Sequence, residues 1–147
     1  MATTKTKGDL AELMVAADLR RKGYKVAIPF GEDWDYDLII ERDGRLERVQ
    51  VKYAESDGAV LMVRCLSHSL TNGKVRHTKK YTASTIDWLA VYDRFTDRCY
   101  YIPAAELGEG KSLIHLRLTP ARNGQRDGIN FAEGYLGLSG TAQQSLG

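Results

Sequence analysis

The sequence has few residues from which a sulfur or imidazole metal site could be built. Its two cysteines, Cys65 and Cys99, lack CxxC spacing, so neither a zinc site nor a disulfide framework is predicted. The three histidines, at positions 68, 77 and 115, are too dispersed to show the spacing of metal ligands. We therefore expect free, reduced thiols in an intracellular, cytoplasmic protein.

Long apolar runs and a strong excess of one charge are also missing. No segment approaches the roughly 20 apolar residues that cross a bilayer, and no signal-peptide pattern opens the chain. The net charge of +2 is too small to indicate a nucleic-acid binder by itself. The length of 147 residues fits one domain. We predict one domain over residues 1–138, a flexible tail over residues 139–147 and no membrane contact.

The clearest local pattern is the stretch "DYDLIIERDGRLERVQVKY", residues 35–53. Apolar and polar residues alternate on both sides of Asp43-Gly44, which predicts a β-hairpin with strands over residues 35–42 and 45–53. A helix is predicted from Thr3 or Thr4 to about Lys22, because Gly23 follows as a typical C-terminal glycine. Further strands are predicted over residues 24–30, 59–66 (as a central strand), 88–93, 98–103 and 113–118, with a short helix over residues 81–86.

Polar side chains interrupt this hairpin where a simple sheet would not require them. Gln50 and Lys52 lie two residues apart on one strand, so both side chains leave the same face. Asp37 lies on the neighbouring predicted strand, and Glu12 is at helical spacing to apolar positions of the first helix. We therefore expect the four side chains to converge, with Lys52 able to offset charge that develops on a phosphate.

Oxygen-bearing side chains in this cluster predict a site for a hard divalent cation. Asp37, together with Glu12 or the Gln50 carbonyl, supplies the oxygen ligands that Mg²⁺ prefers. Asp33 and Asp35 are near enough in the chain to compete as ligands, although a solvated loop is the role we favour for both.

The motifs resemble the PD-(D/E)XK nuclease superfamily. The resemblance rests on "YDLII" followed by "RVQVKY", after a helix reading "KGDLAELMVAADLRRKGY", and it extends from about Lys7 to Leu136. It is closer still to the branch with glutamine in the third motif position, typified by homing endonucleases encoded within group I introns. The resemblance implies an α/β (α+β) fold with a restriction-endonuclease-like core: a central mixed sheet flanked by helices, with an extra β-hairpin.

The resemblance also implies a role for each residue of the cluster. Glu12 matches the helix carboxylate that helps to bind metal, and Asp37 matches the essential metal-binding aspartate. Gln50 stands where most of the superfamily has Asp or Glu, and Lys52 matches the motif lysine. Tyr36 replaces the proline that names the motif, which changes little because that proline is not a ligand.

A basic segment follows the predicted strands. Its Asn72-Gly73 pair predicts a second hairpin, within residues 67–78, and a two-stranded ribbon fits the DNA major groove. A solvated basic loop is the alternative. The predicted DNA-contacting residues are Lys7, Lys74, Arg76, His77, Lys79 and Lys80.

These features predict a Mg²⁺-dependent endonuclease that makes sequence-specific double-strand breaks in DNA, with Mn²⁺ able to substitute. One site per chain cuts one strand, so we expect a homo-oligomer, at least a dimer, and the resemblance implies a tetramer. Two alternatives remain open. A Holliday-junction resolvase is disfavoured by Gln50, because such enzymes generally have Glu there. A non-catalytic DNA-binding module on the same fold is kept open by the neutral Gln50 and disfavoured by the intact Glu12, Asp37 and Lys52.

Overall fold

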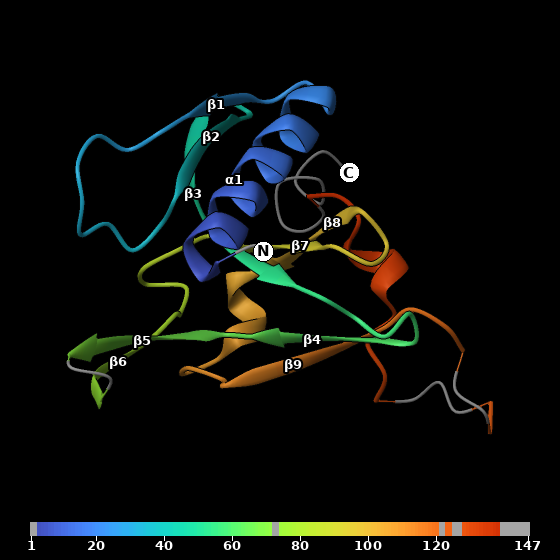
Figure 1. Ribbon diagram of the computed structural model, residues 1–147. Helices are drawn as coiled ribbons and strands as arrows, with labels where there is room; N and C mark the ends of the chain where they lie inside the picture. The colour runs from blue at the N-terminus through green and yellow to red at the C-terminus, as the bar shows by residue number, and fades with distance from the viewer. Residues whose placement is uncertain (1–2, 72–73, 121–122, 125–127, 139–147) are drawn as a thin grey trace.

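The computed structural model describes residues 3–71, 74–120, 123–124 and 128–138 (Figure 1). The side chains of residues 68–77 are not part of this description. The predicted tail, residues 139–147, and the predicted hairpin tip at Asn72-Gly73 therefore lie outside the described residues. None of the described helices combines the length and the apolar character that crossing a membrane requires.

The first helix, α1 (Thr4–Arg21), forms where the sequence predicts it. Thr3 caps its N-terminus, because the Thr3 hydroxyl accepts a hydrogen bond from the Thr6 backbone N–H at 3.1 Å. The helix ends before Gly23, whose φ of +93° is easily adopted by glycine. Ala11, Val15 and Leu19 are fully buried and anchor α1 on one face of the sheet.

The central sheet is mixed, as predicted. It contains β1 (Lys25–Ala27), β2 (Leu38–Arg42), β3 (Arg45–Ala54), β7 (Trp88–Asp93) and β8 (Arg98–Pro103). Their order is β1-β2-β3-β7-β8, and β3 and β7 are parallel while the other neighbours are antiparallel. The strand with the motif residues, β3, is therefore paired on both edges, which fixes its backbone.

The first hairpin is confirmed, with a shorter first strand than expected. Asp43 and Gly44 both have positive φ, +53° and +77°, as a tight hairpin turn requires. The strand begins at Leu38 rather than at residue 35, so Asp37 lies just before it and donates its backbone N–H to the Val49 carbonyl at 2.9 Å. The predicted strand over residues 24–30 likewise shortens to β1.

The strand predicted over residues 59–66 is present in its middle part, but its predicted central position in the sheet is wrong. Its core, β4 (Val60–Arg64), pairs instead with β9 (Leu113–Arg117) in a separate two-stranded sheet. Leu61 and Val63 are buried while Met62 and Arg64 are exposed, so this strand buries one face only. Figure 1 shows this ribbon on the side of the central sheet away from most of α1.

The second hairpin extends from the end of β4 and consists of β5 (Leu66–Thr71) and β6 (Lys74–Lys80). The chain then returns to the central sheet through residues 81–87. The short helix predicted over residues 81–86 is wrong: the segment is a turn. Side-chain hydroxyls explain this, because Thr82 bonds to Ser84 at 2.7 Å and the Thr85 hydroxyl donates to the Thr82 carbonyl at 3.1 Å.

Two apolar clusters hold the layers together. One lies between α1 and the sheet and includes Val49 and Val51 of β3. The other lies between the sheet and the β4–β9 ribbon, and includes Leu89 and Val91 of β7. Two short 3-10 helices, η1 (Ala104–Leu107) and η2 (Ala132–Tyr135), contribute to this second cluster.

Candidate active site

The strand β3 presents Gln50 and Lys52 on its face away from α1. Their neighbours Val49 and Val51 pack in the cluster beneath α1, and alternate residues of a strand point to opposite faces. Gln50 is buried, with 9% of its surface exposed, and its carboxamide Nε2 donates to the Val51 carbonyl at 3.3 Å. The predicted common face of Gln50 and Lys52 is therefore present.

Asp37 is fixed against the middle of this strand. Its carboxylate accepts a hydrogen bond from the Val51 backbone N–H at 2.9 Å, and Val51 lies between Gln50 and Lys52. Burial raises the pKa of Asp37, whereas the Val51 hydrogen bond and the Lys52 ammonium oppose that rise. The sequence order alone could not show this backbone contact.

Glu12 reaches the same place from α1. Glu12 and Asp37 line one hollow of about 230 Å³ at the edge of the sheet. Burial, with smaller contributions from the negative charges of Asp37 and Asp9, raises the pKa of Glu12 to about 7. No hydrogen-bond or ion-pair partner of its carboxylate is found among the described residues. This pair of neighbouring carboxylates is an environment that a cation would stabilise.

Lys52 is half-buried and interacts electrostatically with Asp37. Its ammonium Nζ donates to the Leu66 carbonyl at 3.0 Å and to the Ser67 hydroxyl at 2.8 Å. Burial lowers the pKa of Lys52, while the Asp37 carboxylate counters that effect. The ammonium therefore sits in a fixed position close to the negative charge of Asp37.

The oxygen donors fit a hard divalent cation. In the described part of the chain, no three His, Cys, Asp or Glu side chains gather as a metal-binding group. Glu12 and Asp37, which line one hollow, would provide two carboxylates. Gln50, on β3, does not line that hollow, and its amide oxygen would be the third, neutral donor. Such an all-oxygen set suits Mg²⁺, with less negative charge than a third carboxylate would give.

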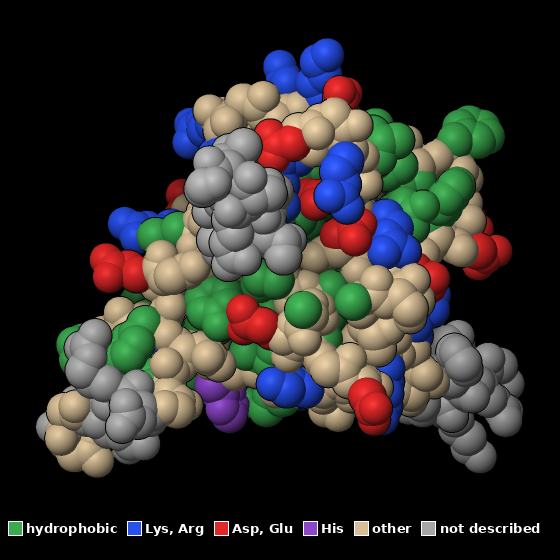
Figure 2. All heavy atoms as spheres, turned by 180° about the vertical axis from the view of Figure 1, so that it is seen from behind, with side chains coloured by type: hydrophobic (Ala, Val, Ile, Leu, Met, Phe, Trp, Pro, Cys, Tyr) green, Lys and Arg blue, Asp and Glu red, His purple; other side chains and the backbone are tan. Residues whose placement is uncertain are grey.

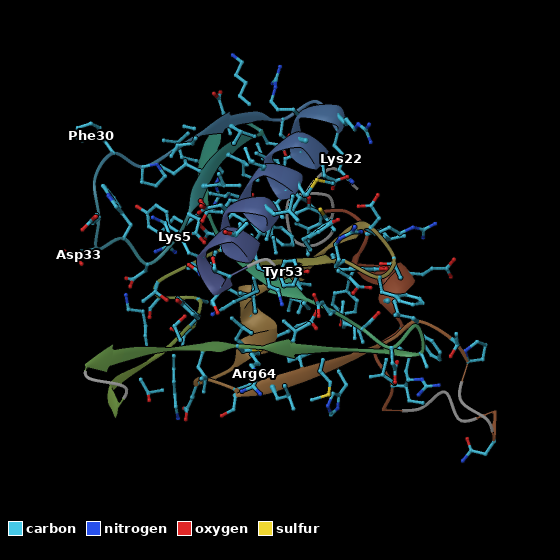
Figure 3. The ribbon with its side chains drawn as sticks, viewed as in Figure 1. Lys5, Lys22, Phe30, Asp33, Tyr53 and Arg64 are labelled. Atoms are coloured by element: carbon cyan, nitrogen blue, oxygen red, sulfur yellow. The ribbon has the colours of Figure 1, made fainter. Side chains whose placement is uncertain are left out.

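Asp33 and Asp35, the two aspartates that could compete as metal ligands, have different surroundings. Asp33 lines the hollow that contains Glu12 and Asp37, on an exposed turn with φ +66°. Asp35 forms an ion pair with Lys79 of β6 at 3.0 Å. Figure 3 shows Asp33 and Phe30 at the outer end of the loop that precedes β2.

The predicted DNA-contacting residues are only partly placed. Lys7 lines a second hollow, of about 500 Å³, together with Lys52, and its ammonium lies 3.6 Å from the Glu55 carboxylate. Lys80 is exposed near the base of the second hairpin, where Lys79 pairs with Asp35. The side chains of Lys74, Arg76 and His77 lie outside the described residues.

Sequence reasoning did not identify Ser67 and Tyr81 as neighbours of Lys52. The ring of Tyr81 lies 5.4 Å from the Lys52 ammonium, and its hydroxyl bonds to the Ser67 hydroxyl at 2.8 Å. Ser67 lies in β5 and Tyr81 directly follows β6, so both reach Lys52 of β3 only through tertiary packing. No local pattern in the sequence could have shown the contact.

Glu12→Gln is expected to stabilise the metal-free protein at alkaline pH. Because the folded protein raises the pKa of Glu12 from 4.5 to about 7, this carboxyl favours folding below pH 4.5 and loses that contribution as the pH rises through 7. Neutral glutamine avoids the loss. Allowing for solvent screening of this partly exposed group, we expect a gain of about 1–2 kcal/mol above pH 8.

The measurement is urea unfolding in EDTA at two pH values, about 5 and about 8.5. The matched control is Glu133→Gln, which changes an exposed glutamate on η2 and should leave stability unchanged at both. If Glu12→Gln increased the free energy of unfolding equally at both pH values, the raised pKa of Glu12 would not be the cause.

The fold and this cluster together define a class of nuclease. The chain belongs to the PD-(D/E)XK endonuclease family, whose sequence profile matches residues 2–138. Its structure is similar to that of a bacterial homing endonuclease, I-Ssp6803I, with a TM-score of 0.72 and 26% sequence identity. The superposition covers 91% of this chain and 88% of that chain, which confirms the predicted fold class. A comparison with curated proteins finds no match.

Proposed function

We propose that this endonuclease is a Mg²⁺-dependent enzyme of the homing type, which cuts both strands of duplex DNA at specific sequences. The observation that carries the proposal is that Glu12 and Asp37 line one hollow, while burial raises the pKa of Asp37 and the hydrogen-bonded ammonium of Lys52 is close enough to lower it. Similarity to the structure of a bacterial homing endonuclease supports a function of the homing type. The glutamine at position 50 agrees with the intron-encoded branch that the motifs resemble.

Glu12, Asp37 and the Gln50 amide oxygen would hold the Mg²⁺, and we expect Mn²⁺ to substitute. When bound, such an ion polarises phosphate oxygens and lowers the pKa of a coordinated water. The half-buried Asp37 carboxylate keeps a fixed orientation through the Val51 N–H. The metal-binding group is thereby preorganised before DNA arrives.

Lys52 supplies the positive charge that phosphodiester hydrolysis requires. As water attacks phosphorus, negative charge grows on the phosphate oxygens and on the leaving oxygen. The ammonium has three N–H donors, and the Leu66 carbonyl and Ser67 hydroxyl accept from it. A further donor can then be directed at the phosphate.

We assign DNA binding to the second hairpin and to the N-terminal end of α1. On the face seen in Figure 2, described Lys and Arg side chains are interspersed with Asp and Glu, without one broad basic patch. Lys7 lines the same hollow as Lys52, which places one basic residue of α1 close to the proposed site. The proposed contacts are Lys7, Lys74, Arg76, His77, Lys79 and Lys80.

The proposed double-strand cut implies more than one copy of the chain. One cluster of Glu12, Asp37, Gln50 and Lys52 serves one phosphodiester at a time. We therefore propose a homo-oligomer, at least a dimer, with a tetramer as the arrangement that the sequence resemblance favours.

The test is cleavage of a randomised plasmid library and of a four-way junction, each with Mg²⁺ or with EDTA. We expect metal-dependent breaks at particular linear sites. Cutting confined to the junction would instead identify a resolvase. Binding of DNA without cleavage under any metal condition would identify a non-catalytic module, and either result would overturn the proposal.

A further inference from the structure

The ammonium of Lys52 is held by the base of the second hairpin, not by its own sheet. The carbonyl of Leu66 and the hydroxyl of Ser67, at the start of β5, accept its hydrogen bonds at 3.0 and 2.8 Å. These contacts join residues that are 14 and 15 positions apart in sequence. The position of Lys52 therefore depends on how the hairpin is seated.

Tyr81, directly after β6, contacts both Ser67 and Lys52. Its hydroxyl bonds to the Ser67 hydroxyl at 2.8 Å, and its ring lies 5.4 Å from the Lys52 ammonium. Tyr81 is only 4% exposed and packs in the apolar cluster beneath the central sheet. A rigid, buried ring thus orients the serine hydroxyl that receives the lysine.

The cross-strand pair to which Ser67 belongs, one rung of the β5–β6 ladder, also contacts the segment that leads to Asp37. Ser67 pairs with Lys79 across the β5–β6 ladder, so the two side chains lie on one face. The Lys79 ammonium pairs with the Asp35 carboxylate at 3.0 Å. Asp35 is two residues before Asp37. The rung of Ser67 and Lys79 therefore contacts both Lys52 and the segment that leads to Asp37.

We propose that Ser67 and Tyr81 are positioning residues that place the Lys52 ammonium for cleavage. The ion pair of Lys79 with Asp35 fixes the segment that leads to Asp37. This inference rests on the proposed nuclease function. In it, the hairpin assigned to DNA binding is also part of the catalytic scaffold. Neither Ser67 nor Tyr81 needs to touch the DNA.

The first test separates positioning from binding. In single-turnover cleavage at saturating DNA, Ser67→Ala and Tyr81→Phe should each be about tenfold slower, because small displacements of a reacting group are costly. Their DNA affinities in EDTA should stay within about twofold of the wild type, because no phosphate contact is removed. Ser67→Thr restores a hydroxyl in a strand and should recover most of the rate.

Matched controls are Ser112→Ala, an exposed serine, and Tyr100→Phe, a buried tyrosine whose hydroxyl bonds to Thr96 away from the cluster. Both should cleave at the wild-type rate. Wild-type cleavage by Ser67→Ala and Tyr81→Phe would overturn the inference while leaving the proposed function intact. Rate losses matched by equal losses of affinity would overturn it as well.

A second readout does not need cleavage. In NMR spectra of protein with ¹⁵N-labelled lysine, a hydrogen-bonded Lys52 ammonium should give a resolved signal, assigned by its loss in Lys52→Met. That signal should broaden or vanish in Ser67→Ala and persist in Ser67→Thr. If the wild type cuts no DNA, the proposed function fails. An unchanged Lys52 signal in Ser67→Ala would then separately refute the positioning of the Lys52 ammonium by Ser67.

Discussion

Asp37→Asn is expected to abolish DNA cleavage and to leave the fold and the DNA affinity intact. Asparagine keeps an oxygen that can accept the Val51 N–H hydrogen bond, which spans 2.9 Å in the structure. It removes, however, the negative charge that faces Glu12 in their shared hollow. Loss of a metal-binding carboxylate removes several kcal/mol of transition-state stabilisation, which corresponds to a rate loss of about 10³-fold.

Asp57→Asn is the matched control for this variant. The Asp57 carboxylate also accepts backbone hydrogen bonds, from Ala59 and Val60 at 2.8 and 2.9 Å, but it lines neither hollow of the proposed site. Single-turnover cleavage with Mg²⁺ and fluorescence anisotropy with EDTA measure the two properties separately. An Asp37→Asn rate within tenfold of the wild type would remove Asp37 from the proposed metal site.

Lys52→Met is expected to reduce the cleavage rate by about 10²- to 10³-fold, the usual effect of losing one preorganised charge at a developing anion. Methionine has a similar length and fills the space between β5 and Tyr81 without a charge. DNA affinity should change by no more than about threefold, because one cation among several is lost. Single-turnover rates and equilibrium binding at one fixed salt concentration test this.

Lys25→Met serves as the control for Lys52→Met, because Lys25 is an exposed lysine of β1 that lines neither hollow of the site. It should cleave at the wild-type rate. A melting temperature for each variant confirms that a loss of rate is not a loss of fold. If Lys52→Met cleaved as fast as Lys25→Met, the lysine would be structural only.

Local chemistry explains which parts of the fold were predictable. The Thr3 cap, the Gly23 stop and the Asp43-Gly44 turn depend on a few neighbouring residues, and each lies where the sequence predicts it. The pairing of Gln50 and Lys52 on one face follows from the two-residue period of a strand. These features allow the cluster to be predicted from the sequence alone.

Features set by long-range packing were harder to predict. Residues 59–66 are apolar except for Arg64, which predicts a central strand. Met62 and Arg64 are nevertheless exposed while Leu61 and Val63 are buried. The exposure of the apolar Met62 is set by tertiary packing and has no counterpart in the sequence pattern. The contact of Ser67 and Tyr81 with Lys52 gives no local pattern, since it depends on how the second hairpin folds back onto β3.

The rung of Ser67 and Lys79 has a consequence for the design of chimeric enzymes. A graft that exchanged the whole hairpin would replace the acceptors of the Lys52 ammonium and the partner of Asp35, along with the residues proposed to contact DNA. A graft that kept this rung and exchanged only the segment beyond it would preserve both contacts. The junctions of such a chimera, rather than the sequence of the grafted tip, would then decide whether it still cuts.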